Sequence, residues 1–188
     1  DGTWRGSYEN PLEWAEANPL ERTRMHLLSS TFLEIEPLQN LRIKTLLGID
    51  GGDTRTTTSS KPSYVGNYGM GSVGKSFVRA YNLTWTNTAT YSFNIKDYHQ
   101  FNFLLGHEMT RNASDAFSIV ARGQSNDQLL TLSTGTLVSN WNDAVIASTY
   151  LSLFGRAEYA YNNRYYADLS VRRDASSKFG KNARWATF

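Results

Sequence analysis

Apolar and polar residues alternate along several long stretches of the chain. In residues 79–95, the odd positions from Tyr81 onward are mostly apolar or aromatic, and the even positions are Thr, Ser or Asn. A period of two over so many residues indicates a β-strand, because successive side chains of a strand point to opposite faces. Alternation of this kind predicts strands at 24–36, 41–50, 79–95, 100–112, 143–161 and 165–174.

The length of these strands favours one class of β-protein. Strands of ordinary globular domains run about 5–6 residues, whereas a tilted strand that crosses a bilayer needs about 9–11. The alternation in 79–95 is longer than either requires. The pattern therefore predicts an all-β fold in which antiparallel up-and-down strands form part of a large transmembrane β-barrel.

Consecutive strands pair as hairpins in a register that keeps apolar residues opposite apolar ones, and a slip of one residue would reverse this. Pairing Tyr161 with Tyr165 sets Ala157 opposite Leu169. In the first hairpin the register sets Leu33 opposite Ile43, and Glu34 opposite Arg42 on the other face. In the second hairpin it sets Phe93 opposite Phe103.

The last hairpin also brings charges together on its even-numbered face. Glu158 falls opposite Asp168, a repulsive pair, and Arg156 lies where it can bridge both carboxylates, while Arg172 adds a fourth charge. A Lys or Arg at the lipid midplane costs about 2–4 kcal/mol. We therefore expect Arg156, Glu158, Asp168 and Arg172 to face a wet lumen, on a path open to substrate.

Short and long connections alternate along the chain. Barrels of bacterial outer membranes have short periplasmic turns and long extracellular loops. Aromatic residues near the short turns and at Tyr81 and Trp85 fit two interfacial girdles. The predicted short turns are 36–40, 96–99 and 162–164, and the predicted long segments, rich in Gly, Ser, Asn and Asp, are 1–23, 51–78, 113–142 and 175–188.

Composition removes several function classes. The net charge of +2 gives no nucleic-acid footprint, and the absence of Cys excludes disulfides and thiolate metal sites. No apolar run approaches the length of a membrane-spanning helix, and the first twenty residues lack a signal-peptide pattern. His26, His99 and His107 show no metal-ligand spacing, and no nucleophile accompanies a base. We expect no enzyme activity, no metal and no cofactor.

Two glycine-rich motifs invite functional interpretations. Residues 69–76 match the phosphate-binding pattern G-x-x-x-x-G-K-[ST], but that mechanism needs a helix directly after the loop, and a Thr-rich strand pattern follows Ser76 instead. A nucleotide hydrolase is therefore disfavoured, and the motif is interpreted as a surface loop. Residues 50–53 (DGGD) lack EF-hand spacing and are interpreted as a strand-to-loop exit.

The C-terminal sequence FGRAEYAYNNRYYADLSVRRDASSKFGKNARWATF, residues 154–188, resembles the late-barrel signature of the SusC/RagA family of TonB-linked outer-membrane proteins. Ala175 stands where that family usually has Gly. Residues 36–41 and 103–108 are also similar to the family. The matching positions are Arg156, Tyr159, Tyr161, Tyr165, Arg172, Arg173, Asp174, Ser176, Ser177, Phe179, Gly180, Trp185 and Phe188.

The resemblance implies a location in the bacterial outer membrane and import of oligosaccharides or peptides powered through the TonB complex. It also implies a SusD-like surface lipoprotein as partner, and contact with the lipid bilayer. Plugged transporters have about 22 strands, and no plug domain or TonB-contacting segment is recognised in residues 1–188. We therefore expect the chain to be a piece of a longer protein.

One other class of function fits the composition. A soluble all-β carbohydrate-binding module would also carry many aromatic residues, which stack on sugars. Such a sandwich would break the alternation of 79–95 into two strands. The continuity of that segment therefore distinguishes the two hypotheses.

Overall fold

The computed structural model describes residues 10–96, 98–180 and 184–188, and most of them lie in β-strands. A short helix, α1 (Pro11–Ala17), precedes the first strand. Its N-terminal cap is Asn10, whose side chain accepts a hydrogen bond from the Leu12 amide. The strands are β1 (Leu20–Leu38), β2 (Leu41–Ser60), β3 (Gly71–Ile95), β4 (His99–Gln124), β5 (Leu137–Tyr161), β6 (Tyr165–Ser176) and β7 (Trp185–Thr187), with two 3₁₀ turns at Val65–Asn67 and Leu132–Thr134.

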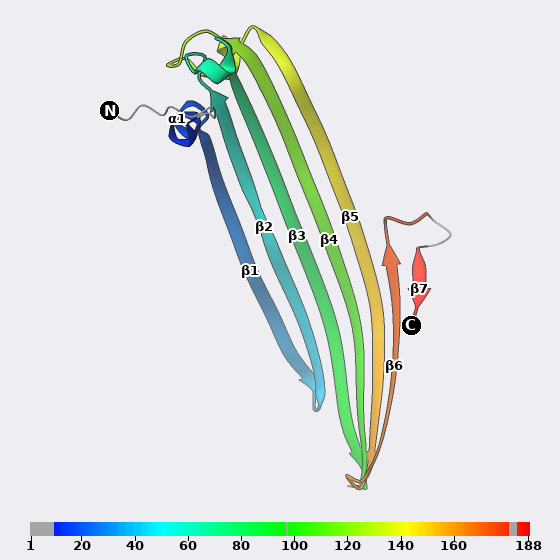
Figure 1. Ribbon diagram of the computed structural model, residues 1–188. Helices are drawn as coiled ribbons and strands as arrows, with labels where there is room; N and C mark the ends of the chain where they lie inside the picture. The colour runs from blue at the N-terminus through cyan, green and yellow to red at the C-terminus, as the bar shows by residue number, and fades with distance from the viewer. Residues whose placement is uncertain (1–9, 97, 181–183) are drawn as a thin grey trace. The chain divides into compact units, whose positions relative to one another are not determined.

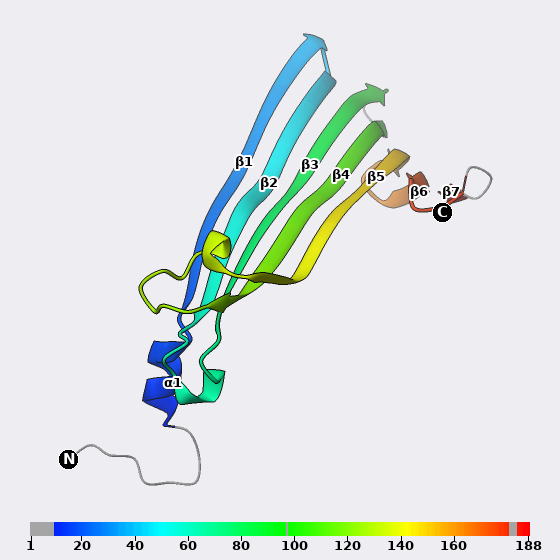
Figure 2. The same cartoon turned by 90° about the horizontal axis from the view of Figure 1, so that it is seen from above.

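The strands form one sheet in chain order, from β1 to β7 (Figures 1 and 2). Each strand from β2 to β6 therefore pairs with the strand before and the strand after it, while β1 and β7 lie at the two ends of the order, which is the predicted up-and-down arrangement. β5 and β6 are antiparallel, and their register pairs Tyr161 with Tyr165 and Ala157 with Leu169, as predicted. Within the described chain, no helix has the length and apolar character needed to cross a bilayer.

The short turns between strands depend on residues with left-handed backbone conformations. Asn40 follows β1 with φ +65°, and Lys96 follows β3 with φ +51°. Asn162 and Asn163, between β5 and β6, have φ of +50° and +52°. Asn tolerates this region better than most residues, and two successive positive φ values match the twist of a tight hairpin. These turns lie at the predicted places and fix the hairpin registers.

The strands extend well beyond the predicted limits at their other ends. Residues 51–60 and 71–78 belong to β2 and β3, and most of 113–142 belongs to β4 and β5. The prediction of long loops over these segments was therefore wrong, and the connections themselves are only 61–70 and 125–136. Their Gly, Ser, Thr and Asn content was interpreted as loop composition, but small polar residues are compatible with a ladder in which every backbone group is paired.

Three further predictions about local structure are corrected. Residues 50–53 lie within β2 and are not a strand exit, because Gly52 lets the backbones of β1 and β2 approach closely. The C-terminal segment 175–188 was expected to be a loop, but β6 continues to Ser176 and β7 pairs with it antiparallel. The glycine-rich motif 69–76 was interpreted as a surface loop, but from Gly71 onward it lies in β3, and no helix follows Ser76.

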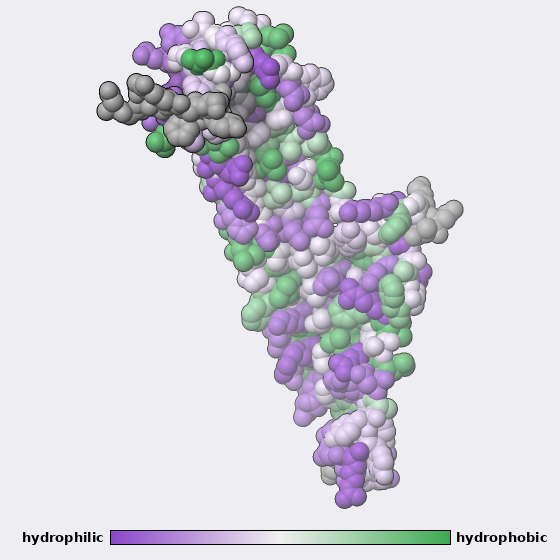
Figure 3. All heavy atoms as spheres, in the orientation of Figure 1, coloured by the Kyte–Doolittle hydropathy of each residue, from purple (hydrophilic) through white to green (hydrophobic). Residues whose placement is uncertain are grey.

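The described chain divides into two compact units, each of which takes one part of every long strand. Unit 1 comprises residues 10–26, 52–80 and 114–145, and unit 2 comprises 27–51, 81–113 and 146–188. The buried apolar side chains among the described residues are Ala17, Val73 and Ala121, all in unit 1. In unit 2, hydrophobic residues lie on the surface beside hydrophilic ones (Figure 3), and Leu105 and Leu169 are each 68% exposed. Among its described residues, the sheet of unit 2 thus has no buried apolar core.

The close approach at Gly52 gives a testable consequence for stability. A methyl group there would overlap the backbone carbonyl oxygen of Met25 on β1, and a carbonyl held in a ladder has little room to move. We predict that Gly52→Ala lowers the free energy of unfolding by about 1–3 kcal/mol, the usual cost of overpacking. The measurement is the thermal unfolding midpoint of the full-length protein in detergent.

Gly48→Ala, in the same strand, is the matched control. A methyl group at Gly48 would have the Thr84 carbonyl oxygen as its nearest neighbour at 3.9 Å, an ordinary contact. Its unfolding midpoint is expected to stay unchanged or rise slightly, because Ala restricts the unfolded chain. Equal midpoints for the two variants would show that the approach of β1 to Gly52 is not a constraint.

Candidate functional site

A row of hydrogen-bonded polar side chains crosses β3, β4, β5 and β6 in unit 2. We call it the first polar row. The Arg156 Nε donates to Asp168 Oδ1 at 3.0 Å, and its Nη2 lies 2.8 Å from Glu158 Oε1. Asn102 donates from Nδ2 to Glu158 Oε2 at 2.6 Å, and Ser92 donates from Oγ to Asn102 Oδ1 at 2.9 Å. Arg156 therefore bridges the repulsive pair Glu158–Asp168 as predicted, and two uncharged residues extend the row.

A second polar row crosses the same four strands. Arg172 donates from Nε to Asp174 Oδ1 at 2.9 Å and from Nη2 to Ser152 Oγ at 3.0 Å. Its Nη2 also lies 3.9 Å from Glu108 Oε1, and Glu108 accepts a hydrogen bond from the Thr86 hydroxyl at 3.3 Å. The sequence grouped Arg172 with the charges around Arg156. The structure instead gives it partners of its own.

A cleft of about 580 Å³ lies over the first polar row. Arg156, Glu158 and Asp168 line it together with the ring of Tyr166. The side chains of Arg156 and Asp168 are about half exposed, so the row remains open to solvent while its members bond one another. Such a lining offers donors and acceptors for hydroxyl, amide or charged groups of a small ligand.

Aromatic residues occupy the odd positions near the short turns of unit 2. Phe93 stacks on Phe101 with ring centroids 5.1 Å apart and on Phe103 at 6.0 Å, as the predicted register requires. Phe101 in turn lies 5.0 Å from Tyr159 on β5. The Tyr159 hydroxyl is 2.7 Å from His99 Nδ1. These aromatic residues form a cluster at odd-numbered positions, whereas the first polar row occupies even-numbered positions of the same strands.

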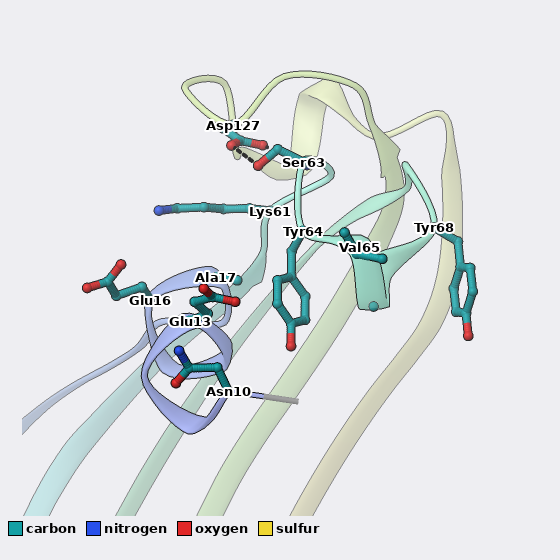
Figure 4. Close-up of a pocket in the computed structure, with 11 residues that line it drawn as sticks. Asn10, Glu13, Glu16, Ala17, Lys61, Ser63, Tyr64, Val65, Tyr68 and Asp127 are labelled. Carbon is teal, nitrogen blue, oxygen red and sulfur yellow. Dashed lines mark hydrogen bonds between the residues drawn. The ribbon is translucent and has the colours of Figure 1, made fainter. Parts of the chain in front are cut away.

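A second cleft, of about 650 Å³, lies in unit 1 among α1 and the loops that follow β2 and β4 (Figure 4). The Ser63 amide donates to Asp127 Oδ1 at 3.1 Å, and the Ser63 hydroxyl donates to Oδ2. These bonds, with Lys61 nearby, hold the pKa of Asp127 below its ordinary value of 3.8. The carboxylate therefore ties one loop to the other. The cleft is lined by Asn10, Glu13, Glu16, Ala17, Lys61, Ser63, Tyr64, Val65, Gly66, Tyr68 and Asp127.

The family-signature residues mostly organise the end of β6. Ser177 exchanges hydrogen bonds with the Thr149 backbone, through its amide and its side chain, each at 2.9 Å. The Ser176 Oγ accepts from the Lys178 amide at 3.3 Å, and Ser176 is 8% exposed. The Arg173 guanidinium lies 4.8 Å from the Trp185 ring centroid on β7. These contacts give the signature a structural role.

The other signature positions are more open. Tyr165 stacks on Tyr161 across the hairpin with centroids 6.4 Å apart. Phe179 and Phe188 are 59% and 75% exposed. A methyl group on Gly180 would have no atom within 4 Å, so local crowding does not explain a glycine at that position.

Several members of the polar rows were missed as site residues. Asn102 and Glu108 occupy even positions of a predicted strand, so the alternation placed them on the polar face. Their bonds to Glu158 and Arg172 depend on the register of β4 against β5, and a long connection leaves that register unspecified in the sequence. The missed residues are Ser92, Asn102, Thr86, Glu108 and Ser152.

No group of three His, Asp or Glu side chains within residues 10–96, 98–180 and 184–188 is arranged to hold a metal ion. His107 instead packs edge-on against Trp85, with ring centroids 5.8 Å apart. The polar rows are suited to hydrogen bonding and charge complementarity.

The known proteins to which the chain is similar are of one kind. No family model matches the chain. It is 27% identical over 204 residues to TonB-dependent receptor P26 of Formosa agariphila, covering 98% of the chain and 20% of that receptor. It is also 27% identical over 151 residues to TonB-dependent receptor SusC of Bacteroides thetaiotaomicron, covering 80% of the chain and 15% of SusC. The chain thus spans about one fifth of the length of the curated relatives it matches.

Solved structures agree with this result. The RagAB peptide transporter superposes with a TM-score of 0.88 and 31% identity, over 92% of the chain and 20% of that structure's chain. The RagAB peptide importer in its "open-open" state gives 0.86 and 32%, over 93% and 20%. Sequence, strand order and superposition point the same way: the chain belongs to the SusC/RagA family of TonB-dependent receptors and corresponds to a run of consecutive strands in that family's barrel.

Proposed function

We propose that the chain forms part of the barrel wall and the extracellular loops of an outer-membrane transporter that imports oligosaccharides or peptides with energy from the TonB complex. The even-numbered side chains of its strands face a wet lumen, and the odd-numbered ones face lipid. In this role the chain performs no catalysis. It contributes a wall, a set of polar contacts along the substrate path and part of the outer mouth.

The two-sided character of long strands is the observation that carries this proposal. β3, β4 and β5 have 25, 26 and 25 residues, more than the roughly 9–11 that a tilted membrane strand needs. In unit 2 the even positions hold both polar rows, and the odd positions hold the aromatic cluster. Charged groups in lipid are costly, which supports assigning Arg156, Glu158, Asp168 and Arg172 to the lumen.

A soluble carbohydrate-binding module fits less well. It requires β3 to divide into two strands, and β3 is continuous from Gly71 to Ile95. It also leaves side chains such as Leu105 and Leu169 exposed to water without a core. Extended apolar surface of this kind marks an interface with lipid or another protein.

The relatives suggest the ligand classes and the partners. SusC is named as a TonB-dependent receptor and RagAB as a peptide transporter. The first polar row combines a guanidinium, two carboxylates and an amide, which can bond either sugar hydroxyls or peptide groups. We propose a SusD-like lipoprotein at the extracellular mouth, and coupling to TonB through other segments of the full transporter.

Single-cysteine labelling tests the two faces, because the chain has no Cys of its own. In a full-length protein otherwise free of cysteine, Ser170→Cys should react with a membrane-impermeant maleimide in intact outer membranes, and the adjacent Leu169→Cys should not. Both positions are exposed in the isolated sheet, so only lipid distinguishes them. Thr90→Cys and Tyr91→Cys form a second matched pair on β3. Equal labelling within both pairs would exclude the membrane placement.

Growth on defined nutrients tests transport. Deleting the full-length gene should abolish growth on an oligosaccharide or peptide pool as sole nutrient, while growth on the corresponding monomers continues. Deleting TonB should reproduce this defect, because import against a gradient requires its energy. Undiminished growth of the deletion strain on every oligomeric pool would contradict an import function.

The hydrogen bonds between Ser63 and Asp127, which join the two loops of unit 1, predict that the contact between these loops depends on pH. The hydrogen bonds from Ser63 lower the pKa of Asp127 when the loops are in contact. The Asp127 charge therefore stabilises this contact fully above the ordinary pKa of 3.8, and the stabilisation is lost as the pH falls through the lowered value. Hydrogen-exchange protection of residues 61–70, corrected for intrinsic rates, should therefore stay constant from about pH 6 down to about pH 4 and drop as the pH falls below 3.8. The β6 segment 165–174 serves as the internal reference.

Asp127→Asn is the control for this prediction, because it keeps an acceptor oxygen but cannot ionise. Its protection over 61–70 should already be reduced at the higher pH and should change little on acidification. A wild-type loop that keeps its full protection below pH 3.8 would show that the tie does not depend on the Asp127 charge.

A further inference from the structure

Basic and aromatic side chains gather on the odd-numbered positions of β2, β3 and β4 in unit 1. The Arg79 guanidinium carbon lies 5.4 Å from the Phe77 ring centroid, and that of Arg55 lies 5.8 Å from the same ring. Phe77 packs against Phe117 on β4, with ring centroids 5.9 Å apart. Lys75 precedes Phe77 by one odd position on β3. We call Arg55, Lys75, Phe77, Arg79 and Phe117 the basic–aromatic cluster.

The cluster borders a shallow cleft of about 580 Å³. Arg55 and Lys75 contribute cations to this cleft, and Phe77 and Phe117 contribute rings. Phe117 is 49% exposed, and Arg55 and Lys75 are exposed. The cleft is therefore open to a ligand that has an anionic part and an apolar part.

The charges of the cluster are unevenly compensated. Arg79 is engaged by Asp53, with Nε to Oδ1 at 2.8 Å and Nη2 to Oδ2 at 3.0 Å. Asp115 adds a second carboxylate at an odd position of β4. Arg55 and Lys75 form no ion pair within the part of the chain that the structure describes, and Arg55 has only a longer-range electrostatic attraction to Asp53. These two cations are the ones available to an external anion.

The sequence places the cluster at the end of the apolar stripe. Going back along β3 from Trp85, the odd positions are Leu83 and Tyr81, and then Arg79, Phe77 and Lys75. Under the proposed placement, odd residues face lipid, and an aromatic band marks the membrane interface. Cations directly beyond that band lie at headgroup depth, where basic side chains bind anionic lipid.

We propose that the basic–aromatic cluster binds a phosphate-bearing lipid headgroup of the outer leaflet, with Arg55 and Lys75 on the phosphate and Phe77 and Phe117 against the first part of the acyl chains. The inference rests on the proposed outward orientation of the odd positions. Charge complementarity selects an anionic headgroup, and continuity with the apolar stripe selects a lipid over a soluble anion. The bound lipid would fix the height of the barrel in the membrane.

Lipid retention by the full-length transporter tests the proposal. The protein is reconstituted in phosphatidylcholine nanodiscs containing lipid A, extracted, and analysed by native mass spectrometry. The variant R55A/K75A should retain lipid A at least roughly tenfold less than wild type, equivalent to losing about 1.4 kcal/mol. Wild type should retain dephosphorylated lipid A as poorly as the variant retains the intact lipid. Excess inorganic phosphate should not displace the bound lipid.

R42A/K44A is the matched control. It removes the same charge from even positions of β2, where both cations contact Glu34, and it should retain lipid A like wild type. Equal retention by R55A/K75A and wild type, or displacement by inorganic phosphate, would overturn the lipid site. If the paired cysteine labels still differ in that case, the membrane placement stands and only the lipid inference fails.

Discussion

Backbone pairing between neighbouring strands is the constraint on which the rest of the structure depends. A bilayer offers no water to bond peptide groups, so each strand must satisfy its N–H and C=O groups on the strands beside it. The sheet here pairs its strands in chain order, from β1 to β7, so that β2 to β6 have a neighbour on both sides. With the backbone satisfied by neighbours, the side chains of unit 2 need no common core and can serve two different environments.

This division explains how polar rows and exposed leucines coexist on the same strands. Arg156 bridges Glu158 and Asp168 at even-numbered positions. Leu169, the residue that follows Asp168, occupies an odd-numbered position and is exposed. In a soluble sheet one of these faces would have to be covered. Within a barrel wall, water covers one face and lipid covers the other, so neither the charges nor the leucines need protein partners beyond those seen.

The sequence predicted the hairpins better than the connections between them. Tight turns at Asn40 and Asn162 leave a single register that matches apolar residues, so the Tyr161–Tyr165 pairing was correct. Glycine and small polar residues are ambiguous, because they suit both loops and closely approaching strands. Gly52 shows this: it resembles a turn residue but lies within β2 against β1. For the same reason the strand ends were placed too early.

The candidate site was predictable only within one hairpin. Arg156, Glu158 and Asp168 lie on strands joined by a short turn, so their contacts follow from register alone. Asn102 and Glu108 reach this hairpin across β4 and β5, whose register is set by a long connection. The separation of Arg172 from Arg156 has this origin only in part, because Glu108 on β4 is a partner that the β5–β6 hairpin cannot reveal, whereas Ser152 lies within that hairpin. Contacts between strands that are joined by a long loop are determined by the whole sheet, and both polar rows include contacts of that kind.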